Sequence, residues 1–560
     1  MEPTTEPTPA PRRKGRALRR LRWQLPLATV TGLIAAFAPL GPAHVAHAAG
    51  GQAEGLVCAA GSTAPGGAPG HLAAVPGTNP SFVLTATDGY ILTPDGNSIY
   101  MWSYANQNGA FQYPGPVLCV NQGDTVTVTL RNYLPVDTSI VFQGITGVTA
   151  DGAPSVPDLA DNSLTKLAAH NPNSEPTAGQ PGGQVTYRFK ADDPGTFAYE
   201  SGTDPQVQVQ MGLVGAIVVR PCTPGASGTP CTPLPDHVYD DVTLNVNQAT
   251  KGGADLSNFS HFNPAHEYLH VLSEVDPDLH QAVEAARPTP FSLTGGPTGP
   301  YKAGDLVTYA GAIWKAMVGA PTGNPGTVAG QWGSFYDLTK YKARYWFING
   351  RSFPDTIAPD SSAHLPAQPY GALVHIQPQS PPGTSPTDPD YNPYPAVVRF
   401  VNAGPVNYPF HPHADHDHQF GIDGAPLINY TNGNNGTSQD VTIDHFGFVV
   451  APGETTEASF SWYDAQQWNA LNNPIMVPMP DVQSRFEGAY WSGSPYLGVR
   501  QDLATGVTQY NQCGEMYHVA HSHALFQATN YGIPSTGMLT MIRVDPPNSF
   551  PGHANCTAGN

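Results

Sequence analysis

Residues 124–132 read Asp-Thr-Val-Thr-Val-Thr-Leu-Arg-Asn. Apolar and polar side chains alternate along this stretch, and most of it is β-branched, so it is predicted to form a strand with one buried face. Similar short runs, bounded by turn residues, lie at 81–85, 98–102 and 139–142. Helical periodicity is confined to one short segment near 278–286, before Pro288. The sequence therefore predicts an all-β fold.

The order of these segments occurs twice along the chain. Residues 124–132 are followed by 139–144, 195–202 and 210–220, and residues 396–402 are followed by 408–413, 517–523 and 537–545. Such a repeat predicts two related β-domains, at 80–222 and 236–546, and the alternating strands indicate that each is a sandwich or a barrel. We expect a small β insertion at 301–338 in the second domain and a tail at 547–560.

Composition excludes several classes of protein. Among 560 residues, 24 are Lys or Arg and 43 are Asp or Glu, a net charge of −19. Gly and Pro contribute 59 residues each, but 40% of the chain is hydrophobic and only 12% is charged, which argues against a disordered chain. The acidic balance, with no basic cluster after the first 25 residues, argues against nucleic-acid binding.

The N-terminus resembles an export signal. Seven basic residues precede an apolar run at 25–40, and Ala46-His47-Ala48 supplies a small-x-small cleavage pattern. A membrane anchor is the alternative, but the run is shorter than the ~20 residues that span a bilayer and contains Pro26 and Pro39. We therefore expect a cleaved signal at 1–48, a flexible leader at 49–79, and a secreted or cell-envelope protein. Arginine pairs are compatible with twin-arginine export.

Six cysteines are expected to form disulfides in an oxidising compartment. They are Cys58, Cys119, Cys222, Cys231, Cys513 and Cys556. Cys222 and Cys231 flank a Gly/Pro loop and form the favoured local pair, while the other pairings stay open.

Several phrases resemble those of the multicopper oxidases, a family built from cupredoxin domains. Pro114-Gly-Pro-Val-Leu with Gly123-Asp-Thr-Val is similar to the opening of the family's first domain. Residues 345–350, Tyr-Trp-Phe-Ile-Asn-Gly, and 451–455, Ala-Pro-Gly-Glu-Thr, are similar to its later strand and turn phrases. The resemblance covers most of 81–546 and implies two cupredoxin-like Greek-key β-sandwich domains.

The resemblance also implies a trinuclear copper site held by four His-x-His pairs, since alternate strand residues share a face. In the first domain the matching positions hold Val141 and Gln143, then Glu200 and Gly202, so its copper motifs are lost. Only Glu200 could still bind a metal there. In the second domain both pairs are kept, and they are His411 with His413 and His521 with His523.

The family's mononuclear copper site depends on a cysteine thiolate and two further histidines. Ser522 stands at the cysteine position, Tyr408 at one histidine position and Gln527 at the other. Without the thiolate, no blue copper centre of the usual kind can form.

The two kept pairs could supply three or four imidazole nitrogens to one or two ions. Imidazole binds copper and zinc among other metals, and copper(II) has the highest general affinity. We therefore predict a copper site, with zinc as the alternative, at His411, His413, His521 and His523. Possible accessory ligands are His416, His418, His518 and Glu200. A polar loop in a decayed domain is the opposing interpretation.

A looser group consists of His261, His266, His270 and His280. Its spacings match no metal-ligand template, so these side chains are interpreted as surface or hydrogen-bonded histidines.

The insertion resembles the small carbohydrate-binding modules of bacterial chitinases. Residues 301–316 read Tyr-Lys-Ala-Gly-Asp-Leu-Val-Thr-Tyr-Ala-Gly-Ala-Ile-Trp-Lys-Ala, but Val318 and Gly319 replace the aromatic pair that usually follows. Exposed aromatic rings stack on sugars because they offer flat apolar area. Tyr309, Trp314 and Trp332 are therefore either a polysaccharide contact or the core of a small spacer.

The sequence is compatible with three functions. The favoured one is an exported copper oxidoreductase of multicopper-oxidase type, with a small-molecule or metal-ion electron donor and O2 as partners. The second is a non-catalytic metal-binding protein, and the third is an envelope-associated structural protein on the same scaffold. A homo-oligomer is compatible with the first. Ser522 lacks a nucleophile-elbow context, which argues against hydrolysis.

Overall fold

The structure is a computed structural model. It describes residues 58, 71–73, 79–107, 110–158, 162–170, 182–223, 232–240, 246–247, 260–286, 289–290, 292–293, 295, 300–310, 312–380, 384–388, 391–413, 417–430, 438–462 and 516–544. All of these lie in one compact unit, 50–560. The expected export signal and tail lie outside the described residues.

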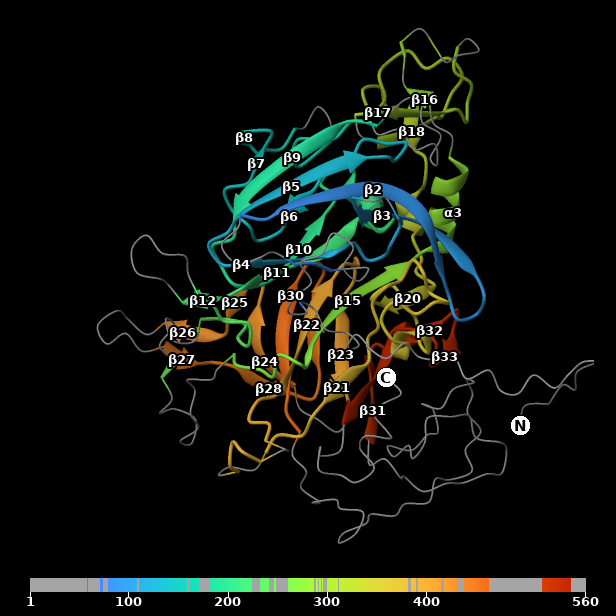
Figure 1. Cartoon of the computed structure of the whole chain (residues 1–560). Helices are drawn as coiled ribbons and strands as arrows, with labels where there is room; N and C mark the ends of the chain where they lie inside the picture. The colour runs from blue at the N-terminus through green and yellow to red at the C-terminus, as the bar shows by residue number, and fades with distance from the viewer. Residues whose placement is uncertain are drawn as a thin grey trace, which may run out of the picture. The chain divides into compact units, whose positions relative to one another are not determined.

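The first β-sandwich consists of two sheets. One has the strand order β3-β2-β5-β9-β7-β8 and the other β1-β4-β11-β10-β6 (Figure 1, blue to green). The strands are β1 (His71–Ala73), β2 (Ser81–Leu92), β3 (Ser98–Asn106), β4 (Val117–Asn121), β5 (Thr125–Asn132), β6 (Val141–Phe142), β7 (Thr149–Ala150), β8 (Ala153–Pro154), β9 (Gln184–Lys190), β10 (Gly195–Glu200) and β11 (Val214–Arg220). The predicted alternation is confirmed in β5, where every second side chain is buried.

The second β-sandwich repeats this construction. Its larger sheet has the order β20-β15-β22-β30-β24-β25, with β28 also paired to β24, and its smaller sheet β21-β34-β31-β23-β29. The strands are β15 (Glu267–Val275), β20 (Tyr345–Ile348), β21 (Val374–Ile376), β22 (Ala396–Asn402), β23 (Tyr408–Pro412), β24 (Asp417–Ile422), β25 (Ala425–Pro426), β28 (Ile443–His445), β29 (Phe448–Val450), β30 (Thr455–Phe460), β31 (Met516–Ser522) and β34 (Leu539–Val544).

The internal repeat in the sequence corresponds to a repeat in strand pairing. The first sandwich pairs β4 with β11 in parallel and β10 with both β11 and β6 in antiparallel. The second pairs β21 with β34 in parallel and β31 with both β34 and β23 in antiparallel. The predicted all-β fold of two related β-sandwiches is therefore confirmed. The domain limits 80–222 and 236–546 stay a proposal, because the described chain forms one unit.

The two sandwiches share an apolar interface, which explains why some strands are buried on both faces. All seven residues of β11 are buried. Ile217 and Val219 point into the first core, whereas Val214, Ala216 and Val218 pack with Leu269 and Val271 of β15. The far face of β15 enters the second core. Such strands are continuously apolar because neither face meets water.

A buried ionic network crosses the same interface. Glu267 accepts hydrogen bonds from Arg220 and from Arg399 Nε, the latter at 2.7 Å. Arg399 also donates to the Thr196 hydroxyl at 3.1 Å, and Glu457 accepts from the Thr196 amide at 2.8 Å. Strands β10 and β11 of the first sandwich are thereby tied to β15, β22 and β30 of the second.

The insertion forms a four-stranded sheet of its own. Its strands are β16 (Thr289–Pro290), β17 (Leu306–Tyr309), β18 (Ala312–Ala316) and β19 (Trp332–Ser334), in that order. The sheet begins at β16, before the predicted limit of 301, because β16 pairs in parallel with β17. Ile313 packs with the core of the first sandwich, although the insertion interrupts the second in sequence.

The leader departs from the prediction of a flexible tether. Cys58 forms a disulfide with Cys119 of β4, and β1 adds to the same strand in parallel. The prediction is wrong for these residues because the edge of β4 offers backbone groups that β1 satisfies. Cys222 is also disulfide-bonded. Its predicted partner, Cys231, lies outside the described residues.

Helices contribute little to the described chain. They are α1 (Pro205–Gln208), α3 (Pro277–Ala285) and the 3-10 helices η3 (Leu338–Lys340), η4 (Asp355–Ile357) and η5 (Leu525–Ala528). The predicted helix is confirmed as α3, whose Asp276 side chain accepts from the Asp278 amide at 3.0 Å. Within the described residues, none of the helices is long and apolar enough to cross a bilayer.

The remaining short strands form three small sheets. They are β12 (Cys222–Thr223) with β13 (Thr232–Pro233); β14 (Val246–Asn247), β27 (Ser438–Asp440) and β26 (Ile428–Tyr430); and β32 (Thr529–Asn530) with β33 (Ile533–Pro534).

Candidate metal centre

The predicted histidine pairs lie on adjacent antiparallel strands. His411 belongs to β23 and is the cross-strand partner of His521 on β31. His413 and His523 directly follow these strands, two residues further along each. Because alternate residues of a strand share a face, the pairing brings the imidazoles of both pairs to one side of the sheet.

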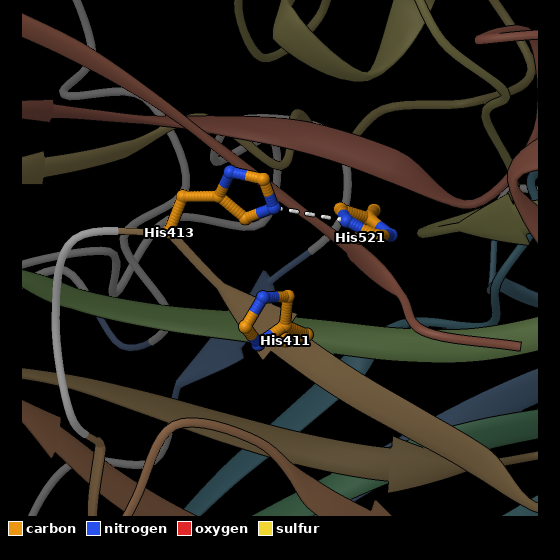
Figure 2. Close-up of side chains that lie close together, drawn as sticks. All are labelled: His411, His413 and His521. Carbon is orange, nitrogen blue, oxygen red and sulfur yellow. Dashed lines mark hydrogen bonds between the residues drawn. The ribbon is translucent and has the colours of Figure 1, made fainter. Parts of the chain in front are cut away.

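Three of these imidazoles converge on one point (Figure 2). The Nε2 atoms of His413 and His521 lie 3.1 Å apart, and ligand nitrogens of His411, His413 and His521 all lie within 4.8 Å of one another. The His523 ring centre lies 4.9 Å from that of His411 and 5.9 Å from that of His521. His523 is thus close to the group, but it is not one of the three residues whose ligand atoms meet the 4.8 Å limit.

Backbone carbonyls fix the orientation of two of the rings. His521 Nδ1 donates to the Ser522 carbonyl at 2.8 Å, and His411 Nδ1 donates to the Phe446 carbonyl. A histidine that donates through Nδ1 keeps an unprotonated Nε2 for a ligand bond, as metal-binding histidines commonly do. Side-chain patterns in the sequence could not reveal these two orienting groups, because both are backbone atoms.

Electrostatics favour the neutral, metal-binding form of the rings. Burial lowers the pKa of His521, and the neighbouring His413, His411 and His523 lower it further. Burial likewise lowers the pKa of His413, together with His411 and His523. His413 is exposed and His521 is buried, so the group opens to solvent on one side.

The donor set fits a single transition-metal ion. Two nitrogens that lie about 2.0–2.1 Å from one ion are roughly 3 Å apart, close to the separation of the His413 and His521 Nε2 atoms. All three donors are imidazole nitrogens, which suit copper, zinc, nickel and iron. The arrangement therefore fits one ion with room for a further ligand on the open side.

The positions of the family's mononuclear site hold hydrogen-bonded polar groups instead. The buried Ser522 hydroxyl donates to Gln527 Oε1, and Gln527 Nε2 donates to the Asn407 carbonyl at 3.1 Å. The Tyr408 hydroxyl, which is also buried, donates to Glu274 at 3.2 Å. These residues do not fit a blue copper ion, because they offer no thiolate and are engaged with the protein.

The first sandwich holds a different pair at the equivalent place. Val141 is the cross-strand partner of Glu200, as His411 is of His521. Gln143 Nε2 donates to Glu200 at 2.6 Å, and burial raises the pKa of Glu200 although this hydrogen bond lowers it. Glu200 is not a member of the three-histidine group.

The other accessory candidates that the structure describes contact other groups and are not members of the three-histidine group. His418 donates through Nδ1 to Asp444 at 2.6 Å. His518 stacks on Trp462 with ring centres 4.6 Å apart, and burial, with His413 nearby, lowers its pKa to about 4. His416 lies outside the described residues.

Two members of the looser histidine group are confirmed as hydrogen-bonded side chains. His270 donates to the Ala372 carbonyl at 3.1 Å and His280 to the Tyr100 carbonyl at 2.6 Å. Burial lowers the pKa of each to about 4.

The aromatic residues of the insertion differ in their surroundings. Trp332 is 6% exposed and packs edge-on against Tyr301. Its proposed stacking on sugar is therefore wrong, because the ring belongs to the core of the insertion. Tyr309 and Trp314 are partly exposed and line a cavity of about 470 Å³ between the insertion and α1.

The fold and the convergent imidazoles define a β-sandwich protein with a candidate metal centre. Residues 91–161 match the family model of multicopper oxidase. That match lies in the first sandwich, which lacks the histidine pairs. The chain is 28% identical over 170 residues to laccase abr2 of Aspergillus fumigatus, covering 30% of this chain and 25% of that protein.

A second relative is copper resistance protein A of Pseudomonas syringae pv. tomato. It is 33% identical over 152 residues, which are 26% of this chain and 21% of the relative. The matched regions thus span about a quarter or less of these two curated relatives. The solved blue copper oxidase from Nitrosomonas europaea aligns with a TM-score of 0.42 and 16% identity, over 82% of this chain and 85% of that one.

Proposed function

We propose that the protein is an exported copper-binding oxidoreductase of multicopper-oxidase type, with its copper set reduced to the second sandwich. The observation that carries the proposal is the 3.1 Å approach of His413 and His521 through their Nε2 atoms, beside His411. Without an ion, one of these two nitrogens donates a hydrogen bond to the other. An ion between them would satisfy both lone pairs.

Copper is preferred to zinc for two reasons. Copper(II) stands above zinc in general affinity for nitrogen ligands. In addition, the relatives reported above are a laccase and a copper resistance protein by name. Zinc remains the alternative, and a metal analysis separates the two.

Copper bound to these residues would supply a one-electron redox couple. His411, His413 and His521 would hold it, while the Phe446 and Ser522 carbonyls keep the rings oriented. Since Ser522 and Gln527 replace the thiolate site, an electron donor would have to approach the metal directly. The ring of Phe446 is 65% exposed and its centre lies 5.8 Å from that of His411, so it offers such a donor an apolar contact.

We propose a small phenol or a reduced metal ion as the donor and O2 as the acceptor. The test is oxygen uptake by copper-loaded protein with a simple phenol and, separately, with Fe²⁺. Uptake should exceed that of the apoprotein and be lost in His521→Ala. Copper binding without uptake from either donor would favour the alternative, a non-catalytic metal-binding protein.

We also propose that the protein is exported, contacts a polysaccharide and forms a homo-oligomer. The Cys58–Cys119 disulfide supports an oxidising compartment. For an envelope-associated role, the cavity beside Tyr309 and Trp314 is where a sugar could bind. Trp314→Ala should then weaken retention on insoluble polysaccharide, and unchanged retention would remove that contact. Equilibrium sedimentation tests the homo-oligomer.

A further inference from the structure

A second group of side chains that could hold a metal ion lies near the junction of the two sandwiches, where Arg220 lies over the ring of Phe262. It consists of Asp236, His237 and His261, whose ligand atoms all lie within 4.8 Å of one another. None of the three belongs to the histidine pairs of β23 and β31. Short ligand spacings in the sequence do not predict this group, because His261 lies 24 residues after His237.

Backbone pairing places the two segments side by side. His237 and His261 form an isolated antiparallel bridge. The Phe262 amide donates to the Asp236 carbonyl at 2.9 Å, and the Val238 amide donates to the Ser260 carbonyl at 3.1 Å. Backbone hydrogen bonds between the two segments therefore hold the three side chains near one another.

The ligand atoms are already at the spacing of a coordination sphere. Asp236 Oδ1 lies 2.9 Å from His237 Nδ1, and Oδ2 lies 2.8 Å from His261 Nε2. Nitrogen and oxygen ligands about 2.0–2.2 Å from one ion are roughly 3 Å apart, so little movement would be required. Two imidazoles and one carboxylate form a common ligand set for divalent transition metals.

Ring stacking holds the two imidazoles in place, and the Asp236 side of the group is partly exposed to solvent. The ring centres of His237 and His261 are 4.1 Å apart in a stacked arrangement, and His261 stacks on Tyr394 at 3.5 Å. The side chains of His237 and His261 are 13% and 11% exposed, whereas that of Asp236 is 35% exposed. An ion could thus enter beside the carboxylate and keep a solvent ligand.

We propose that Asp236, His237 and His261 form a second metal site, which takes one divalent transition ion of the zinc, cobalt or copper type. Its role is structural. The ion joins the segment at 236–240 to the segment at 260–262, next to the buried network of Arg220 and Glu267. The site is independent of the His411 group and does not require that group to bind copper.

The test uses the full mature chain with His411, His413 and His521 all changed to alanine, so that the first group cannot bind. Zn²⁺ is titrated by calorimetry, and Co²⁺ is followed by its visible absorption. One equivalent should bind to this protein. Adding His261→Ala or Asp236→Asn should weaken binding by at least about tenfold. Asp236→Asn preserves the side-chain shape and decides the matter if His261→Ala fails to fold.

The matched control is His170→Ala. His170 also pairs with an aspartate, Asp137, at 2.5 Å through Nδ1, but it belongs to neither of the metal-ligand groups found in the described residues. This variant should keep the full equivalent of Zn²⁺. The proposal is overturned if the starting protein binds no ion at this site, or if Asp236→Asn binds Zn²⁺ as tightly as its parent.

Discussion

His413 and His521 approach each other through their Nε2 atoms at 3.1 Å, across strands β23 and β31. In the first sandwich the equivalent positions hold Gln143 and Glu200, which are joined by a hydrogen bond of 2.6 Å. The same strand geometry thus carries two different chemistries. Both pairs are joined by a hydrogen bond, but the first consists of an amide and a carboxyl, whereas the second consists of two imidazoles, the side chains that transition metals commonly bind.

Replacing His521 by alanine should weaken copper binding and keep the fold. The variant loses one of the two closest nitrogens, so copper affinity should fall by at least about tenfold to a hundredfold. Calorimetric titration of the apoprotein with Cu²⁺ measures the change. His418→Ala is the control, because His418 pairs with Asp444 outside the three-histidine group. Equal losses in both variants would show that the effect is not local.

Replacing Arg399 by methionine should strongly destabilise the protein. The side chain is fully buried and bonds to Glu267 and Thr196, so its loss leaves Glu267 with an incompletely compensated charge. Breaking a buried pair in this way costs about 3–5 kcal/mol of unfolding free energy. Chemical denaturation measures it.

The control for Arg399 is an exposed ion pair. Lys190 and Asp192 lie 2.5 Å apart with side chains 60% and 55% exposed, and Lys190→Ala should cost less than about 1 kcal/mol. A similar small cost for Arg399→Met would mean that the interface network contributes little to stability.

Acid should weaken the junction through Glu267. Burial would raise the pKa of this carboxyl, but Arg220 and Arg399 outweigh it and the pKa is lowered. A carboxyl whose pKa is lowered in the folded state stabilises the protein at a pH above its unfolded-state pKa of about 4.5. This stabilisation is lost as the pH falls through the folded-state pKa. The melting temperature should therefore drop below about pH 4.5. In Glu267→Gln, this part of the acid loss should be absent, and an unchanged acid profile would argue against it.

The contribution of Asp204 to stability should depend on pH in the opposite direction. Burial raises its pKa to about 7, although Gln206 lowers it by a hydrogen bond. A raised folded-state pKa means that stability is lost as the pH rises from the unfolded value of about 4 towards 7. Asp204→Asn should thus gain stability over the parent across that range and hold the gain above it. Asparagine also tolerates the left-handed backbone at this position, where φ is 43°. A constant difference between pH 4 and 8 would contradict the assignment.

Much of the fold follows from local pattern. Alternation in 124–132 predicted β5, and the repeated order of segments predicted two related β-domains, whose sheets have matching strand orders. The continuous burial of β11 and β15 was not predictable in this way, because it depends on how the sandwiches pack against each other. The anchored leader was missed for a similar reason. Nothing local to Cys58 indicates that Cys119 is its partner.

The candidate metal centre was likewise predictable from the sequence only in part. The resemblance to the multicopper oxidases pointed to His411, His413 and His521, and to Glu200 at a matching position of the first sandwich. It could not show which three of the four histidines bring their ligand atoms closest together, or that Phe446 orients His411 through its carbonyl. The Asp236 group was invisible to spacing rules, since tertiary pairing alone brings His261 to His237.

The most direct test of the central claim is the metal content of the mature protein, exported by its own host and never exposed to chelator, together with its EPR spectrum. The account predicts copper bound by nitrogen ligands, without the intense blue absorption of a copper–thiolate centre. That copper should be absent from the variant with His411, His413 and His521 changed to alanine. Protein without copper, or copper retained in full by that variant, would contradict the account.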